Sequence, residues 1–391
     1  MSIRRSSVFP RRWPHGVAVI GLLVALVGCG TPPSEIPETS GSSHAPRESA
    51  GTSVQPGSDP GEVAWTFETP PLPSDRDAAD DPAIWVDPRD PARSVIIGTD
   101  KKGDHGLVVY DLSGAELQSV GDTSMNNVDL RPRVRLGGEE RVVVVASTIE
   151  ERSLEIFTLD PETRTLEAAG AAPLDTGIRA SGVCLYQPSD DTLFVVASAG
   201  NGSVQQWALT AGNEGIEGEL ARELRFESQV EGCVADDATG RLYVSEETRG
   251  IWSLSADPSA VDDRELIDTV GGAGGLEADI EGLAIARYVD GAAFLVASSQ
   301  GNDRFVVYRL DGSTATVAGS LHVTGPDAHP EDEVTHTDGI EVTLQPLGPP
   351  PFDRGLLMVQ DDDNEEPGGA TANQNFKAIA WGSVEGLLGI P

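Results

Sequence analysis

The feature that most constrains the fold is a unit of three short apolar runs that recurs along the chain. Its clearest copy lies within residues 276–310, where apolar runs at 282–286, 293–298 and 305–310 are separated by Gly, Asn and Asp. Runs of this length, rich in Val, Ile and aromatic residues and bounded by turn residues, predict antiparallel strands joined by tight turns.

The unit occurs six times, at intervals of about 50 residues. In each copy a polar or acidic turn precedes a strand, and two further strands follow after short loops. Units of this size with three or four strands are typical of β-propellers. We therefore expect an all-β fold, a six-bladed β-propeller. The copies begin at residues 80–85, 127–130, 181–186, 231–237, 279–286 and 338–342.

Acidic residues stand at the start of the first strand in most copies. If these strands line a central channel, their leading residues meet at one rim. A lone acidic residue before Gly is ordinarily a simple turn, but its repetition favours metal ligation, because calcium prefers carboxylate and amide oxygens. The expected rim contains Asp80, Asp81, Asp129, Glu231, Asp279, Glu281 and Asp338, and Gln300 follows the second strand of the fifth copy.

The N-terminal part of the chain predicts export. Two arginine pairs precede an uncharged run at 16–28 that ends at Cys29, so residues 1–29 indicate a lipoprotein-type signal peptide with Cys29 as the lipidated residue. Cleavage by an ordinary signal peptidase is the alternative, and the run is short for a membrane-spanning helix. Residues 30–63 are rich in Pro, Ser and Gly and predict a disordered tether. The propeller is expected at 64–391.

The charge of the chain limits its partners. The formal net charge is −36, which argues against nucleic acid and against an anionic membrane surface. A solvated acidic surface is one explanation, and calcium binding is the other. We expect a monomer that contacts a membrane only through its lipid anchor, at the periplasmic or cell surface or in secreted form.

Two cysteines follow Cys29, namely Cys184 and Cys233. They lie in equivalent strands of neighbouring copies but one residue out of step, and one step along a strand turns a side chain to the other face. Export permits a disulfide, yet this difference in register favours two buried free thiols.

Lysine is rare in this chain: the three lysines are Lys101, Lys102 and Lys377. Two are adjacent in the loop at 98–103, which follows a second strand and should lie near the acidic rim. A pair in a loop is ordinarily solvent-facing, but a compact ammonium group near such a rim suits a phosphate.

Eight segments, taken in order, resemble the β-propeller phytases. They include Asp80-Asp81-Pro82 and Thr337-Asp338-Gly339, and the resemblance covers 64–381 across all six repeats. The segments are 80–86, 98–103, 107–112, 126–131, 279–283, 298–302, 337–340 and 373–377.

The resemblance implies a calcium-dependent phosphomonoesterase of the 3-phytase type. Such an enzyme hydrolyses phytate (myo-inositol hexakisphosphate), taken as its calcium salt, to lower inositol phosphates and phosphate. Several calcium ions are implied, with direct attack of a calcium-bound water and no covalent phosphoenzyme. The absence of a Cys-x5-Arg loop and of an Arg-His-Gly motif agrees with this.

The resemblance also implies roles for individual residues. It leaves open which of Lys101 and Lys102 points inward and which of Glu246 and Glu247 serves the site. The implied metal ligands are Asp80, Asp81, Glu231, Glu246, Asp279, Glu281, Gln300 and Asp338. The implied catalytic residues are Glu231, Glu247, Lys101, Lys102 and Tyr186. The implied phosphate-binding residues are Lys101, Lys102, Arg131, Arg152 and Tyr186. Asp361 and Asn364 match positions of uncertain role.

The sequence departs from the family pattern in two places. Arg152 is shifted in register from the arginine usual in the second repeat, and the third repeat has Asn201 where a lysine is usual. Losing that lysine should weaken phytate binding or shift preference to less phosphorylated esters. The alternatives to the enzyme are a non-catalytic, calcium-stabilised propeller that binds a ligand or partner, and a lactonase-like propeller hydrolase, which would have no use for paired lysines.

Overall fold

The computed structural model describes residues 59–391 except 76, 103, 104, 122 and 171. The predicted signal peptide, Cys29 and most of the predicted tether lie outside the described residues. Strand β1 begins at Gly61, so the folded domain starts slightly before the expected boundary at 64. No helix of the described part is both long and apolar enough to cross a membrane.

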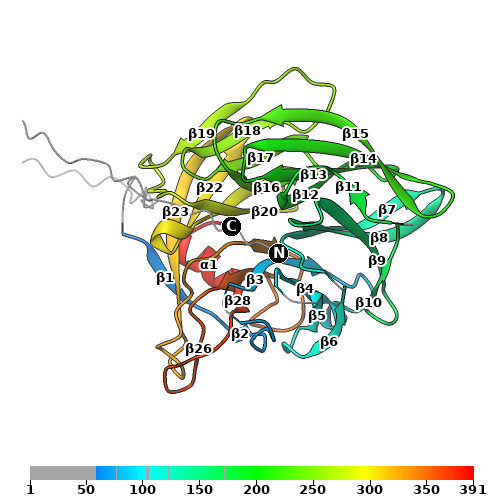
Figure 1. Cartoon of the computed structure of the whole chain (residues 1–391). Coiled ribbons are helices and arrows are strands. Elements are labelled where there is room, and N and C mark those ends of the chain that lie inside the picture. The colour runs from blue at the N-terminus through cyan, green and yellow to red at the C-terminus, as the bar shows by residue number, and fades with distance from the viewer. Residues whose placement is uncertain (1–58, 76, 103–104, 122, 171) are drawn as a thin grey trace, which may run out of the picture. The chain divides into compact units, whose positions relative to one another are not determined.

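The expected six-bladed propeller is confirmed. Six sheets surround a central axis (Figure 1). Blade 1 contains β3 (Ala79–Trp85), β4 (Val95–Asp100), β5 (Gly106–Asp111) and β6 (Glu116–Val120). Blade 2 contains β7 (Val128–Leu136), β8 (Glu139–Thr148), β9 (Ser153–Asp160) and β10 (Thr165–Ala168), with β11 (Leu174–Asp175) paired to β9.

The next two blades are regular four-stranded sheets. Blade 3 contains β12 (Ala180–Ser189), β13 (Thr192–Ala199), β14 (Ser203–Ala211) and β15 (Ile216–Arg225). Blade 4 contains β16 (Val230–Asp236), β17 (Arg241–Glu246), β18 (Gly250–Ser255) and β19 (Glu265–Thr269).

The last two blades use the N-terminal strands to close the ring. Blade 5 contains β20 (Ile280–Arg287), β21 (Ala293–Ser299), β22 (Arg304–Asp311) and β23 (Thr314–Thr324), and β1 (Gly61–Ala64) adds in parallel to β23. Blade 6 contains β24 (Ile340–Thr343), β25 (Leu356–Asp361), β28 (Asn375–Ala380) and, as its outer strand, β2 (Phe67–Glu68). The short elements are η1 (Pro91–Arg93), η2 (Gln300–Asn302), β26 (Glu365–Glu366), β27 (Ala370–Thr371) and α1 (Trp381–Leu388).

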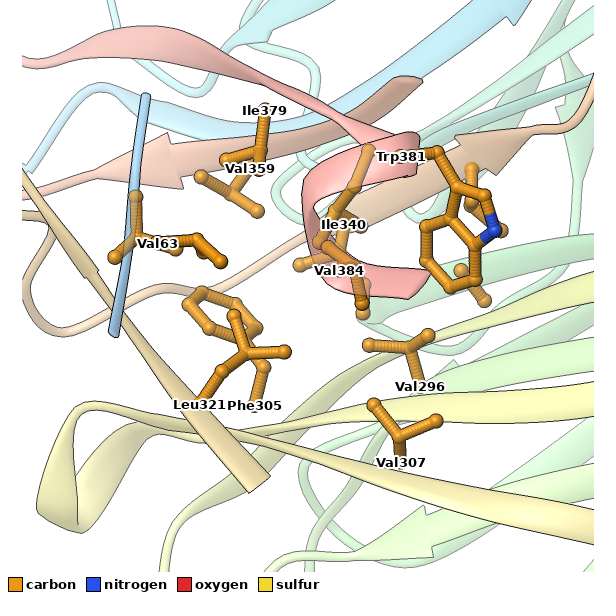
Figure 2. Close-up of a cluster of buried hydrophobic side chains, with 14 of the residues drawn as sticks. Val63, Val296, Phe305, Val307, Leu321, Ile340, Val359, Ile379, Trp381 and Val384 are labelled. Carbon is orange, nitrogen blue, oxygen red and sulfur yellow. The ribbon is translucent and has the colours of Figure 1, made fainter. Parts of the chain in front are cut away.

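The core lies between the blades. Each strand alternates its side chains between two faces, and both faces pack on a neighbouring blade, which explains the nearly continuous apolar runs. Between blades 5 and 6, Phe305, Ile379 and Trp381 are buried with Val63 of β1 and Val384 of α1 (Figure 2). The two ends of the described chain therefore share one core cluster.

The first strand of each blade lines the channel, as expected. Strands β3, β7, β12, β16, β20 and β24 contact one another in a closed ring. Hydroxyl groups on the second strands link neighbouring blades. Ser198 Oγ donates to the main-chain oxygen of Glu231 (2.6 Å), and Ser245 Oγ donates to that of Glu281 (2.9 Å).

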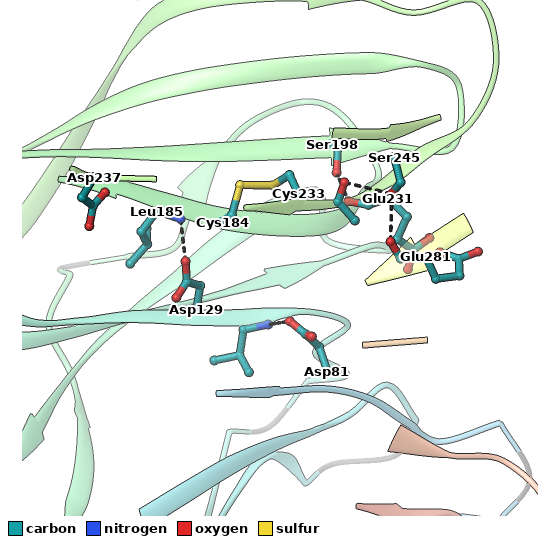
Figure 3. The surroundings of a disulfide bond; sticks show 12 residues. Asp81, Asp129, Cys184, Leu185, Ser198, Glu231, Cys233, Asp237, Ser245 and Glu281 are labelled. Carbon is teal, nitrogen blue, oxygen red and sulfur yellow. Dashed lines mark hydrogen bonds between the residues drawn. A yellow bond between two sulfur atoms is a disulfide. The ribbon is translucent and has the colours of Figure 1, made fainter. Parts of the chain in front are cut away.

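Cys184 and Cys233 form a disulfide that joins β12 to β16 (Figure 3). The expectation of two free thiols is wrong for a geometric reason. Each blade packs one face on the opposite face of its neighbour, so residues that point toward each other are one step apart in equivalent strands. The difference in register therefore brings the two cysteines into one buried cluster, together with Val196 and Val244.

Candidate active site

Glycine residues allow the acidic side chains of neighbouring blades to meet at one mouth of the channel. A Cβ atom at Gly182 would lie 1.9 Å from the main-chain oxygen of Glu231, and one at Gly232 would lie 2.0 Å from that of Glu281. Only a residue without a side chain permits this approach. In Glu231-Gly232, the glycine thus admits the next strand while the acidic side chain stands at the mouth.

Lys101 is the cation at the centre of this mouth. Its ammonium group lies 2.9 Å from Asp80 Oδ2, 2.7 Å from Asp338 Oδ2 and 2.6 Å from Asp77 Oδ1. Burial would lower the pKa of Lys101, but the carboxylates of Asp80 and Asp338 outweigh it and hold that pKa above its usual value. The ammonium group is therefore charged throughout the physiological range.

Lys102 is more exposed than Lys101 and, among the described residues, pairs with Asp77 but not with Asp80 or Asp338. Its side chain is 41% exposed, compared with 17% for Lys101, and its ammonium group lies 3.6 Å from Asp77. Of the two lysines, Lys101 is the one that points into the rim.

Three glutamates from blades 4 and 5 form a compact oxygen cluster beside Lys101. One carboxylate oxygen from each of Glu231, Glu247 and Glu281 lies within 4.8 Å of the others. Burial raises the pKa of Glu231 to about 7, and Asp338 adds to the shift. Burial, followed by the charge of Glu231, raises the pKa of Glu247 to about 8 and that of Glu281 well above its usual value.

This cluster fits a calcium ion. Glu247 Oε1 and Glu281 Oε2 are buried and accept no hydrogen bond from the described residues. A buried carboxylate oxygen without a donor is costly, and a cation bound between the three glutamates would remove that cost. The donor set consists of oxygen alone, which is the set that calcium prefers.

Amide side chains hold several rim carboxylates in place. Asn126 Nδ2 lies 3.1 Å from both Asp80 Oδ2 and Glu231 Oε1, and Asn127 Nδ2 donates to Asp80 Oδ1 (3.2 Å). Gln300 donates from Nε2 to Asp338 Oδ1. Asn126 is a residue that our sequence reasoning did not select, although its acceptors on two blades make it a bridge across the mouth.

Two predicted metal ligands lie outside the cluster of three glutamates. Asp81 lies deeper in the channel, where its Oδ2 accepts from Val128 N of blade 2 (3.1 Å), and burial raises its pKa. Asp279 is exposed at the rim, close enough to raise the pKa of Glu247.

Both carboxylate oxygens of Glu246, a predicted metal ligand, accept hydrogen bonds from other residues. Its Oε1 accepts from Glu227 N and from Ser228 N and Oγ, and its Oε2 accepts from Trp252 Nε1 (2.8 Å). These hydrogen bonds lower the pKa of Glu246 despite its burial. Of the adjacent pair, Glu247 therefore joins the carboxylate cluster and Glu246 does not.

Two predicted phosphate-binding residues lie away from the rim. Arg131 pairs with Asp129 (3.1 Å) and Asp237 (2.7 Å), and all three line a separate cavity of about 310 Å³ that does not include the rim carboxylates. Tyr186 is 7% exposed and stacks on Phe194 in the core between blades 3 and 4. Asp129, predicted at the rim, uses its Oδ2 to accept from Leu185 N (2.7 Å).

A cleft of about 530 Å³ opens beside Glu231. Its lining includes Arg152, as predicted for phosphate binding, and Asn201, the position without the expected lysine. Ser181 and Arg179 also line it, and sequence reasoning missed both. Ser181 precedes Gly182 as Glu231 precedes Gly232, so the repeat alignment could have indicated that Ser181, rather than Tyr186, stands at the mouth.

Asp361 and Asn364 surround the third lysine instead of joining the rim. Lys377 is fully buried, and its ammonium group lies 2.5 Å from Asp361 Oδ2, 2.5 Å from Asp332 Oδ1 and 3.2 Å from Asn364 Oδ1. The ammonium group balances buried carboxylates next to the outer strand of blade 6.

Fold and site together define a six-bladed propeller whose channel mouth carries a cation-accepting carboxylate cluster beside a lysine and an arginine-lined cleft. A family model for phytases matches residues 50–389. The chain is also 38% identical over 329 residues to a 3-phytase from Bacillus subtilis (strain 168), covering 82% of this chain and 84% of that protein. The chain therefore belongs to the phytase family.

Two of the solved structures that match this chain are only distantly similar to it. The major allergen Mala s 1 of Malassezia sympodialis is 15% identical with a TM-score of 0.45, covering 72% of this chain and 89% of that one. A Bacteroides thetaiotaomicron protein of unknown function is 10% identical with a TM-score of 0.47, covering 82% of this chain and 75% of that one. The assignment does not rest on either.

Proposed function

We propose that this protein is a calcium-dependent phosphoric monoester hydrolase that removes phosphate from phytate. The family match and the 3-phytase relative support the reaction class and the substrate. The observation that carries the proposal is the cluster of Glu231, Glu247 and Glu281, with its two buried, unpartnered oxygens next to the charged Lys101.

The residues that would hold calcium are Glu231, Glu247 and Glu281. Asp80 and Asp338 lie close by, and both pair with Lys101. When bound, calcium supplies the positive charge that makes an acidic rim attractive to phosphate, and it lowers the pKa of water. Asn126 orients Asp80 and Glu231, and Gln300 orients Asp338. These amides fix the carboxylates before a ligand arrives, as catalysis by pre-organised charge requires.

Lys101 provides a second, fixed positive charge that attracts the phosphate. Its ammonium group is largely buried and held by three carboxylates, so little reorganisation is needed when an anionic group approaches. Among the described residues both cysteines are disulfide-bonded, so neither offers a thiolate for a covalent intermediate. This supports direct hydrolysis by water.

We further propose an exported protein, with lipidation at Cys29 and a tether that holds the domain away from the membrane. The apolar run before Cys29 and the polar composition of 30–58 support this. The Cys184–Cys233 disulfide supports it independently, because disulfides persist in oxidising compartments.

Phosphate release from phytate tests the proposed function. The purified protein is assayed with calcium, with excess chelator, and after calcium is added back, and the melting temperature is followed in parallel. We expect release that chelator abolishes and calcium restores. Absence of release from a protein whose melting temperature still rises with calcium would contradict the enzyme and favour a calcium-stabilised binding propeller.

A further inference from the structure

The cleft beside Glu231 lacks the lysine expected at position 201, but arginine side chains line it. Asn201 contributes no charge, and its Oδ1 accepts from Ser203 N (3.0 Å). Among the described residues that line this cleft, the basic ones are Arg179 and Arg152. Arg179 stands two residues before Ser181, so the start of β12 positions it at the channel mouth.

The guanidinium group of Arg179 forms an ion pair with the carboxylate of Glu150. Its Nη1 donates to Glu150 Oε2 (2.9 Å) and its Nη2 to Glu150 Oε1 (2.5 Å), a bidentate pair. Both side chains are well exposed, 51% for Arg179 and 72% for Glu150. The hydrogen bonds and charge of Arg179, followed by the charge of Arg152, lower the pKa of Glu150.

We propose that Arg179 is a specificity-determining residue that binds a phosphate group of the substrate in this cleft, and that Glu150 competes with that phosphate for the same guanidinium group. The inference rests on the proposed function for the identity of the substrate. It assigns to Arg179 the contact that a lysine at position 201 would otherwise provide.

Physical chemistry favours the exchange of partners. An exposed ion pair contributes little net stability, so breaking the pair with Glu150 costs little. A phosphate accepts the same two parallel N–H bonds as a carboxylate and carries more charge. Arg179 and Glu231 both line this cleft, so a substrate with several phosphates can place one at the glutamate cluster and another at Arg179. A substrate with a single phosphate therefore gains nothing from Arg179.

The test uses the full-length protein at one fixed calcium concentration. KM and kcat are measured for phytate and for p-nitrophenyl phosphate, and the Kd of myo-inositol hexasulfate, a non-hydrolysable analogue, is measured by calorimetry. For Arg179→Gln we expect KM for phytate and Kd for the analogue to rise about tenfold, because the charged bidentate contact is lost. kcat and all constants for p-nitrophenyl phosphate should stay unchanged. Arg179→Lys should recover part of the loss.

Glu150→Gln tests the competition. It should lower KM for phytate and Kd for the analogue about threefold, because the uncharged amide competes less strongly for the guanidinium group. Arg141→Gln is the matched control. Arg141 forms an exposed pair with Glu139 at the opposite end of β8, so its removal should leave every constant unchanged.

Three results would overturn the inference. An unchanged Kd for the analogue in Arg179→Gln would exclude the contact, whether or not the wild-type protein hydrolyses phytate. Equal losses for phytate and p-nitrophenyl phosphate, together with a lower melting temperature, would make Arg179 a structural residue. A higher Kd in Glu150→Gln would mean that Glu150 orients Arg179 instead of competing for it. Normal binding of the analogue without turnover of phytate would contradict the proposed function alone.

Discussion

The disulfide between Cys184 and Cys233 joins β12 of blade 3 to β16 of blade 4, the strand that also carries Glu231. Cys233 follows Glu231 by two residues, so the covalent bond holds blade 3 to the strand that presents one of the three clustered glutamates. Figure 3 shows the disulfide in the same region as Glu231 and Asp129.

We predict that replacing both cysteines by serine destabilises the domain. The two residues are 49 apart in sequence, and closing a loop of this size should contribute roughly 2–4 kcal/mol to the free energy of unfolding. Urea unfolding of the calcium-loaded double variant should reveal this loss. An unchanged free energy of unfolding would mean that the disulfide adds no stability to the packing of β12 against β16.

Lys101 and Lys102 should differ sharply in their effect on catalysis. Lys101→Met removes a buried, charged group from the rim, and kcat/KM for phytate should fall at least about 100-fold. Lys102→Met should change kcat/KM less than about threefold, because an exposed charge contributes little. Steady-state kinetics on the two variants check this. Equal effects would show that the inward orientation of Lys101 carries no function.

Asn201→Lys should strengthen the binding of phytate. A new ammonium group in the cleft beside Glu231 should lower KM for phytate about three- to tenfold, since a charged hydrogen bond to phosphate is gained. Exposed Asn201 has room for the longer side chain, so the melting temperature should not change. Kinetics on phytate provide the measurement, and an unchanged Michaelis constant would exclude position 201 from substrate binding.

The calcium-free domain should lose stability as pH rises. The pKa values of Glu231 and Glu247, about 7 and about 8, lie above their usual value of 4.5, so the folded state binds protons that the unfolded state has released. Their contribution is complete below about pH 4.5 and is lost as pH rises to about 8, at up to roughly 1.4 kcal/mol per pH unit for each proton.

Melting curves at pH 5 to 8, with chelator and with calcium, check this prediction. Calcium should remove the dependence, because it replaces the protons, and Glu247→Gln should reduce the slope of the chelated form. A chelated domain that gains stability over the same pH range would contradict the assignment of these pKa values.

The fold could be predicted from the sequence because the same pattern of strands and turns recurs six times. A polar or acidic residue followed by Gly marks the strand start in several copies, and the glycine is needed for the approach of the next blade, as at Gly182 and Gly232. The same logic placed Asp80, Glu231, Glu281 and Asp338 at one mouth.

Side-chain direction and choice of partner were harder to predict. Glu246 and Glu247 are adjacent, and only the structure shows that Glu246 is the one that accepts hydrogen bonds from Ser228 and Trp252. Tyr186 lies too far along β12 to reach the mouth, and Arg131 is held by Asp237 from another blade. The disulfide was missed because the alignment of repeats says nothing about which faces of neighbouring blades meet.

The most direct test of the proposed calcium site at Glu231, Glu247 and Glu281 is the calcium dependence of phosphate release from phytate in Glu247→Gln. Glu227→Gln, which removes an exposed carboxylate paired with Arg249 in blade 4, is the control. We predict that Glu247→Gln needs at least about tenfold more calcium for half-maximal release, because one anionic ligand is lost, while the control matches the wild type. Release by Glu247→Gln at wild-type calcium concentrations, or release that persists in excess chelator, would contradict the account.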